Sequence, residues 1–210
     1  MATPRPSRRT IFAFPLMAFG WPTIAAPKPL VVTMLGDSIT AGYGLSAKAA
    51  LPVQLQLALQ KLGIAAVVRA AGVSGDTSAG GLARVDFSVQ KDTHLVIVAL
   101  GGNDLLQGLD TKATRANLDA IVKRLKARNM AVLLAGIAAP REVGTAYARD
   151  FNALFASIAK ARGVPLYPNL IEGAAQRPDL MQADAIHPNA RGAALIAARL
   201  APVVAKALKR

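Results

Sequence analysis

The stretch LVVTMLGDSITAGYG, residues 30–44, changes abruptly from apolar and β-branched residues to small and polar ones. Its first half is typical of a buried strand, and its second half, which contains three glycines, is typical of a tight turn. Ser38 stands just after the expected strand, between Asp37 and Ile39. We interpret Gly36 as the residue that permits the turn, and Ser38 as a residue at the N-terminus of a helix on the edge of a sheet.

Short apolar runs alternate with longer amphipathic stretches along the rest of the chain. The runs predict strands at 30–35, 64–68, 95–100, 131–137 and 164–167. Most of them are apolar throughout, which is typical of strands that are covered on both faces. The stretches between them predict helices at about 50–62, 77–90, 116–125, 145–161 and 189–208. This alternation predicts a single-domain α/β fold with three layers, in which helices cover both faces of a parallel sheet.

The first 26 residues differ from the rest and predict an export signal. Arg5, Arg8 and Arg9 precede a short apolar run at 11–19, and small residues follow at 23–26. A charged region, an apolar region and a small-residue cleavage site in this order are typical of a secretory signal peptide. The paired arginines also fit a twin-arginine signal. We therefore expect 27–210 to be the mature domain, in the periplasm of a bacterium or secreted from it.

The composition excludes several kinds of chemistry. The chain of 210 residues has no cysteine and only two histidines, His94 and His187. A disulfide, a thiolate nucleophile and a multi-histidine zinc site are therefore excluded, and we expect no metal and no cofactor.

The net charge is strongly positive. It is +13 for the whole chain, and +10 without the three arginines of the first 26 residues. The basic residues are scattered along the expected helices and are not interleaved with aromatic residues, so we expect no nucleic-acid partner. A weak association with an anionic membrane surface stays open.

Polar and small residues follow each expected strand at its carboxyl end. Because these ends lie at one edge of a parallel sheet, we expect the residues to gather there. The segments are GDS at 36–38, GVSGD at 72–76, GGND at 101–104, APR at 139–141 and DAIHP at 184–188. Together they hold a serine, a histidine, glycine amides and an asparagine amide, which is the set of groups that a hydrolase needs.

Ser38 and His187 are the candidate nucleophile and base. A serine hydroxyl attacks only when a base removes its proton, and an imidazole with a pKa near about 6.5 can do so at neutral pH. Asp184, three residues before His187, can hold the ring in one tautomer. The backbone amides of Ser38 and Gly75 and the side-chain amide of Asn103 can then meet the negative charge that forms on an acyl oxygen.

These segments, in this order, resemble the GDSL, or SGNH, hydrolases. Residues 36–40, 71–78, 101–104 and 184–188 are similar to blocks I, II, III and V of that family, most of all in its bacterial arylesterase, thioesterase I and lysophospholipase branch. The resemblance implies a flavodoxin-like fold with five parallel strands in the order 2-1-3-4-5. It also implies that Ser38, Asp184 and His187 form the catalytic triad, and that Ser38, Gly75 and Asn103 form the oxyanion hole.

We therefore expect a monomeric serine esterase that cleaves small-molecule carboxylic esters or thioesters through an acyl-enzyme. A carbohydrate O-deacetylase on the same scaffold and a non-catalytic module that binds the cell envelope are the alternatives. The loops at 104–112 and 138–150 are expected to build the acyl groove, with Leu105, Leu106 and Leu109 as a candidate apolar wall.

Five further polar residues are not expected to act in catalysis. Asp37 is expected to hydrogen-bond within its turn, and Asp104 to cap the helix after 101–102. His94 lies at the start of the third expected strand, on the edge of the sheet opposite the site. Ser157 and Lys160 match the Ser-x-x-Lys pattern, but they lie inside an amphipathic helix, and we interpret the match as chance.

Overall fold

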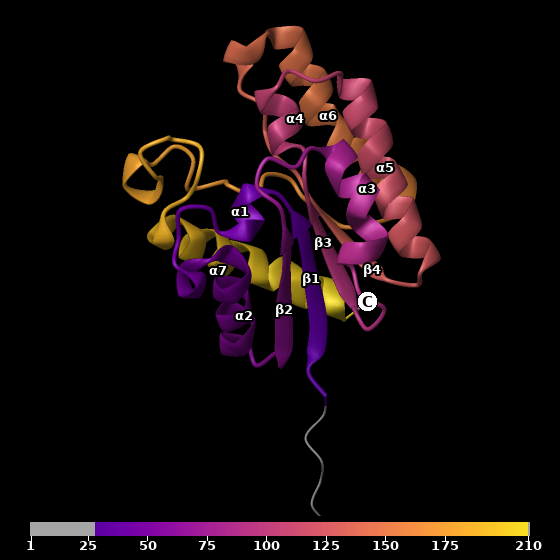
Figure 1. Ribbon diagram of the computed structural model, residues 1–210, viewed down its shortest axis with the longest axis vertical. Coiled ribbons are helices and arrows are strands. Elements are labelled where there is room, and N and C mark those ends of the chain that lie inside the picture. Colours follow the sequence, from indigo (N-terminus) through magenta and orange to yellow (C-terminus); the bar gives the residue numbers. More distant parts are fainter. Residues whose placement is uncertain (1–27, 210) are drawn as a thin grey trace, which may run out of the picture.

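The structure is a computed structural model that describes residues 28–209, so the predicted signal peptide lies outside the described residues. Five strands form one sheet in the order β2-β1-β3-β4-β5. The order of β2, β1, β3 and β4 can be followed in Figure 1. All neighbouring strands in it run parallel. The predicted fold class and strand order are confirmed.

All five predicted strands are present, but the bounds of the second, fourth and fifth differ from the predicted ranges by at least two residues. They are β1 (Leu30–Gly36), β2 (Ala66–Gly72), β3 (Leu95–Ala99), β4 (Ala131–Ala135) and β5 (Leu166–Tyr167). The range predicted for the second strand, 64–68, was wrong. β2 pairs with β1 along its whole length, and because it is an edge strand its second half is only partly buried and lacks the apolar run of a central strand.

Helices occupy the stretches predicted for them, and the two short helices expected after Asp37 and after 101–102 lie at the carboxyl edge of the sheet. They are α1 (Ser38–Ala41), α2 (Leu51–Lys61), α3 (Ser78–Ser88), α4 (Gly102–Leu106), α5 (Thr111–Ala127), α6 (Thr145–Arg162) and α7 (Ala190–Leu208). Local signals set several of their ends. The Asp110 side chain accepts a hydrogen bond from the Lys112 N–H at the start of α5, and Gly163 ends α6 with a φ of +62°.

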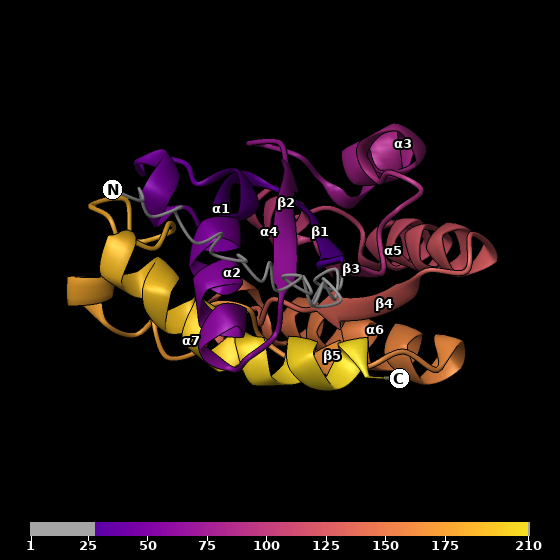
Figure 2. The same ribbon diagram turned by 90° about the horizontal axis from the view of Figure 1, so that it is seen from below.

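The helices form one layer on each face of the sheet. Figure 2 shows α2 and α7 on one face, and α3, α5 and α6 on the other. Successive residues of β1 point to opposite faces, so Met34 packs in the first core with Leu55 and Ile196, whereas Leu35 packs in the second with Phe151. Helices thus cover both faces of the sheet, so a functional site can form only at the ends of the strands. Within 28–209, no helix is long and apolar enough to cross a membrane.

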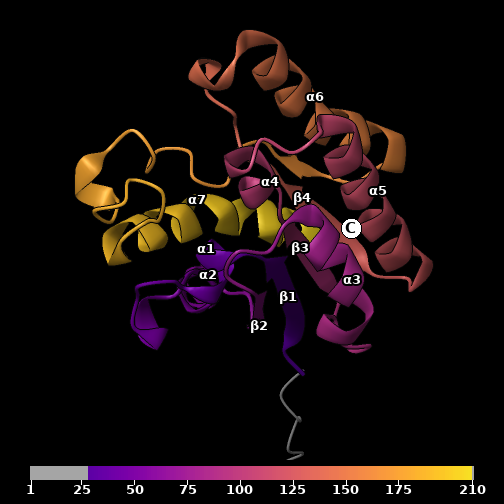
Figure 3. The ribbon, with the colours of Figure 1, turned by 45° about the horizontal axis from the view of Figure 1, so that its top comes forward.

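The short helix α1 sits directly on the carboxyl ends of β1 and β2. Gly36 and Gly72 are register partners at those ends. A Cβ on Gly36 would lie 2.1 Å from Thr40 Oγ1, and a Cβ on Gly72 would lie 2.4 Å from the backbone nitrogen of Ala41. Gly36 has no positive φ, so the absence of a side chain, and not backbone freedom, is what permits the turn. Figure 3 shows α1 and α4 at this edge of the sheet.

Candidate active site

Ser38 is the first residue of α1, and the preceding Asp37 is the N-cap. Asp37 Oδ1 accepts a hydrogen bond from the Ile39 N–H at 3.1 Å, which confirms the predicted role of Asp37 in the turn. The cap and the close packing of α1 on the sheet hold the Ser38 hydroxyl at the sheet edge.

The structure brings Ser38, His187 and Asp184 together. The distance from Ser38 Oγ to His187 Nε2 is 2.8 Å, and His187 Nδ1 lies 2.6 Å from Asp184 Oδ2. A carboxylate can only accept a hydrogen bond, so Nδ1 carries the ring proton and Nε2 offers its lone pair to the serine hydroxyl. The imidazole is thus oriented to take a proton from Ser38.

The tight turn that carries His187 also holds the aspartate. Asp184 Oδ1 accepts hydrogen bonds from the backbone N–H groups of Ile186 and His187, each at 3.0 Å. Ala185 completes the turn with a φ of +57°. The backbone N–H of His187, its ring N–H and the N–H of Ile186 lower the pKa of Asp184 from 3.8 to about 2, so the carboxylate is ionised at neutral pH.

The ring of Tyr43 packs against the imidazole ring of His187. Its ring centroid lies 4.7 Å from that of His187, with an angle of 39° between the planes. Gln182 Nε2 donates hydrogen bonds to the carbonyl oxygens of Tyr43 and Pro188, which ties the two loops together. Tyr43 was not among the predicted site residues. The signal available in the sequence was its position between two glycines, Gly42 and Gly44, both of which have a positive φ in the structure.

Three N–H donors line the same cavity as Ser38 and His187. In the part of the chain that the structure describes, the backbone N–H groups of Ser38 and Gly75 have no acceptor. Asn103 Nδ2 donates one proton to the Asp76 carbonyl at 2.9 Å, which leaves its second proton free. The predicted donors are therefore present at one place with hydrogen-bonding capacity to spare.

Arg84, which the sequence analysis missed, anchors the loop that carries Gly75. Its guanidinium donates to Asp76 Oδ2 at 2.5 Å, and to the carbonyl oxygens of Ala71 at 2.9 Å and Gly36 at 2.8 Å. These acceptors lie at the ends of β1 and β2 and in the loop after β2. A single side chain from α3 thus joins the segments on both sides of the site.

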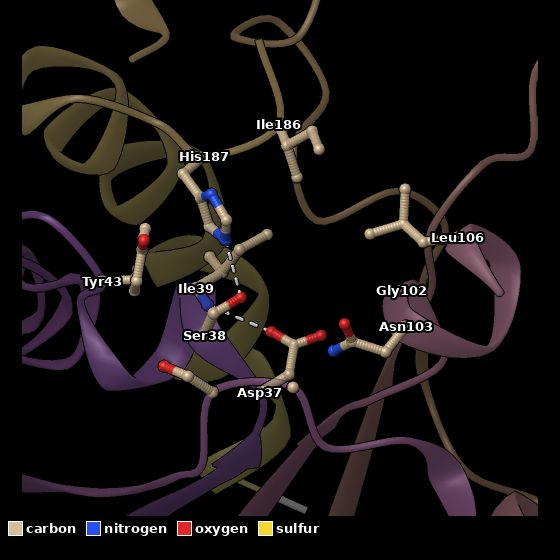
Figure 4. A pocket seen from close by; sticks show the side chains of 11 residues that line it. Asp37, Ser38, Ile39, Tyr43, Gly102, Asn103, Leu106, Ile186 and His187 are labelled. Carbon is tan, nitrogen blue, oxygen red and sulfur yellow. Dashed lines mark hydrogen bonds between the residues drawn. The ribbon is translucent and has the colours of Figure 1, made fainter. Parts of the chain in front are cut away.

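Two adjoining cavities open at this edge. The first measures about 190 Å³ and is lined by Asp37, Ser38, Ile39, Tyr43, Ser74, Gly75, Gly102, Asn103, Leu106, Ile186 and His187. The second measures about 450 Å³ and is lined by Ile39, Gly102, Leu105, Leu106, Ile137, Ala138, Ala139, Pro140, Asn169, Ile171, Ala175, Gln176, Ala185 and Ile186. Figure 4 shows Ser38 and His187 pointing toward each other, with Tyr43 on one side and Leu106 and Ile186 on the other.

The predicted apolar wall is only partly correct. Leu105 and Leu106 line the larger cavity, but Leu109 does not. Of the predicted loop at 138–150, residues 138–140 line the larger cavity and residues 141–150 do not. Lining residues from the segment 169–176 were not predicted. This segment follows the short strand β5, and its approach to the site depends on the path of the long loop before Asp184.

The remaining polar candidates are structural. His94 Nδ1 accepts a hydrogen bond from the Val31 N–H at 3.0 Å, at the opposite edge of the sheet. Ser157 lies inside α6, and its hydroxyl donates to the Leu154 carbonyl. The prediction that Asp104 caps the helix after 101–102 was wrong, because no side chain caps the N-terminus of α4. The Asp104 carboxylate instead accepts a hydrogen bond from Ser78 at the start of α3.

The model of the GDSL-like lipase/acylhydrolase family matches residues 34–195. The chain belongs to this family. The thioesterase 1/protease 1/lysophospholipase L1 of Escherichia coli K12 is 40% identical over 168 residues, which are 80% of this chain and 79% of that protein. The arylesterase of Vibrio mimicus is 31% identical over 176 residues, which are 83% and 88% of the two chains.

A solved structure agrees with these relatives. The crystal structure of AlinE4, an esterase of the SGNH-hydrolase family, is 42% identical, with a TM-score of 0.74, and the match covers 88% of this chain and 99% of that one. The predicted family and branch are confirmed. The chain is an ester-acting hydrolase of this family.

The pKa of the N-cap Asp37 is shifted in the opposite direction from that of Asp184. Its side chain is buried, and burial raises its pKa from 3.8 to about 6, although the Ile39 N–H and His187 act in the opposite direction. Between these two values the folded chain binds more protons than the unfolded chain. The contribution of Asp37 to stability is therefore largest at low pH and falls as the pH rises from about 4 to about 6.

We expect Asp37→Asn to remove this loss, because an amide keeps the acceptor for Ile39 and has no charge to bury. The free energy of unfolding of the variant should exceed that of the wild type by about 1–3 kcal/mol at about pH 8, with a much smaller difference at about pH 4. Urea denaturation of both proteins at the two pH values measures it. An equal difference at both pH values would contradict the assignment.

Proposed function

We propose that the chain hydrolyses carboxylic esters or thioesters through an acyl-enzyme formed on Ser38. The observation that carries the proposal is the 2.8 Å contact between Ser38 Oγ and His187 Nε2, with Asp184 bonded to the other ring nitrogen. A hydroxyl in this setting can lose its proton as it attacks, and the imidazolium that forms is stabilised by the ionised carboxylate.

In the first half of the reaction, His187 Nε2 takes the proton of Ser38 as Oγ bonds to the acyl carbon. The carbonyl oxygen becomes negative and accepts hydrogen bonds from the Ser38 and Gly75 backbone N–H groups and from Asn103 Nδ2. The bond to the leaving group then breaks, and His187 gives its proton to the departing oxygen or sulfur, which leaves as the alcohol or thiol. In the second half, His187 takes a proton from water as the water oxygen bonds to the acyl carbon. The bond to Ser38 Oγ then breaks, His187 returns the proton to Oγ, and the carboxylic acid leaves.

The two cavities suggest how a substrate lies. The larger cavity adjoins Ser38 through Ile39, Leu106 and Ile186, and most of its lining is apolar. We place the acyl chain there and the leaving group on the Tyr43 side. An acetyl group would leave this cavity unfilled, so the lining favours longer acyl chains over the carbohydrate O-deacetylase alternative.

The names of the relatives agree with this substrate class. The Escherichia coli protein is named a thioesterase and lysophospholipase, and the Vibrio mimicus protein an arylesterase. We propose small-molecule esters or thioesters, with acyl chains longer than acetyl, as substrates of this chain also.

We expect Ser38→Ala to lower the turnover of nitrophenyl butyrate by at least about 10³-fold, because the nucleophile is absent. The fold should be retained, as judged by circular dichroism. Ser157→Ala makes the same chemical change within α6 and should keep full turnover. A fluorophosphonate probe should form one adduct, on Ser38. Wild-type protein that turns over no ester and binds no probe would support the non-catalytic envelope-binding alternative instead.

We expect Ala138→Phe to shorten the preferred acyl chain, because its ring would occupy the larger cavity. With a series of nitrophenyl esters, kcat/KM for octanoate should fall about tenfold or more relative to acetate. Ala116→Phe, on the exposed face of α5, is the matched control and should leave the profile unchanged. An unchanged profile in Ala138→Phe would place the acyl chain elsewhere, and faster release of acetate from acetylated sugars than from nitrophenyl esters would favour the deacetylase.

We also propose that residues 1–26 direct export, and that the mature chain acts as a monomer in the periplasm or outside the cell, with weak affinity for anionic membranes. The order of charged, apolar and small residues supports export, and the charge of +10 without that segment's three arginines supports the affinity for anionic membranes.

Expression of the full chain in a bacterium should yield a mature N-terminus near residue 27 in the periplasmic fraction, as determined by N-terminal sequencing. The double variant Arg8→Lys with Arg9→Lys should block export if the twin-arginine route is used, and should leave it unchanged if the general secretory route is used. A cytoplasmic protein that retains residue 1 would overturn the proposal.

A further inference from the structure

We propose that Asp104 is a positioning residue for the reaction, which fixes the distance between the Gly75 loop and Asn103. The inference rests on the proposed function, in which both residues donate to the same oxygen. Asp104 follows Asn103 in α4, and its carboxylate does not line the cavity that holds Ser38. Any effect of Asp104 on the reaction therefore acts through its neighbours.

The Asp104 carboxylate joins three helices. Its residue is 1% exposed. Oδ2 accepts a hydrogen bond from the Ser78 backbone N–H at 2.7 Å, and Oδ1 accepts from the Ser78 hydroxyl at 2.5 Å and from the Thr114 hydroxyl at 3.0 Å. Asn117 Nδ2 donates to the same serine oxygen at 3.1 Å, which orients the hydroxyl proton toward Asp104. The N-termini of α3, α4 and α5 are thereby tied at one point.

The groups that donate hydrogen bonds to the Asp104 side chain are all uncharged. Within residues 28–209, no lysine, arginine or histidine forms an ion pair with Asp104. A buried carboxylate without a cation is costly, and its hydrogen bonds must all be made for the fold to tolerate it. Three hydrogen bonds to one buried carboxyl group, two of them from Ser78, hold the start of α3 close to α4.

Ser78 connects the Asp104 network to the proposed oxyanion donors. Ser78 follows Gly75 by three residues, and the carbonyl of the intervening Asp76 accepts from Asn103 Nδ2 at 2.9 Å. Asn103 and Asp104 therefore hold the two ends of the segment 76–78. The first contact lies at the cavity, and the second, buried behind it, stops α3 from sliding relative to α4. The Gly75 and Asn103 donors can then keep the spacing that the developing charge requires.

We expect Asp104→Asn to lower kcat for nitrophenyl butyrate about 10–100-fold, with KM changed less than about twofold, because misplaced oxyanion donors affect the transition state more than the bound substrate. The amide nitrogen of the variant cannot accept from Ser78, so one donor at the start of α3 loses its acceptor. The rate of fluorophosphonate labelling should fall in parallel with kcat, because attack on phosphorus uses the same donors.

The control is Thr93→Val. It breaks another buried hydrogen bond, that between the Thr33 and Thr93 hydroxyls at 2.8 Å, near the start of β3 at the opposite edge of the sheet. Both variants are assayed at temperatures equally far below their melting points. Thr93→Val should keep the wild-type kcat. An equal loss in both variants would show that Asp104 acts on stability alone and would overturn the inference.

Ser78→Ala tests the same link from the other side and keeps the carboxylate. It should lower kcat by a smaller factor than Asp104→Asn, and the double variant should be no slower than Asp104→Asn alone. If Asp104→Asn does not fold, kcat of Ser78→Ala decides, and a value within twofold of the wild type overturns the inference. Wild-type protein that fails to label on Ser38 overturns the proposed function itself, which keeps the two failures distinct.

Discussion

The close approach of α1 to the ends of β1 and β2 is the constraint on which the rest of the site depends. Gly36 and Gly72 are paired there, and a side chain on either would collide with α1. Since both faces of the sheet are filled by helices, the carboxyl edge is where the chain can present polar groups without emptying a core. The packing of α1 against the ends of β1 and β2 fixes the position of Ser38 at this edge. The long loop after β5 brings His187 to Ser38.

Four aspartates lie close to Ser38, and each has a different partner. Asp37 lines the cavity of Ser38, whereas Asp76, Asp104 and Asp184 adjoin or contact residues that line it. Asp184 is bonded to two backbone N–H groups and an imidazole, and burial raises the pKa of Asp37. Asp76 pairs with Arg84, whereas Asp104 meets hydroxyls and a backbone N–H. The same type of side chain thus has four roles. Asp184 orients the imidazole, Asp37 caps a helix, Asp76 binds Arg84, and Asp104 links the starts of three helices. The difference lies in what each carboxylate touches and in how much water reaches it.

Local patterns in the sequence were sufficient for the family, the fold class and the residues that meet at the site. Ser38, Gly75 and Asn103 each follow a strand directly, so the rule that parallel strands end at one edge places them together. The turn at 184–187 is also local, because the carboxylate bonds to the backbone two and three residues further on. Patterns of this kind are written within a few residues and do not depend on the rest of the chain.

What the sequence by itself determined about this protein is therefore the set of groups at the sheet edge and the order of the strands that carry them. Only the tertiary structure decided the extent of β2, the contact between the Tyr43 and His187 rings, and the partners of Arg84 and Asp104. An edge strand lacks the continuous apolar run of a central one. Contacts between residues from separate elements leave no periodicity in the sequence, because they depend on how helices and loops pack in space.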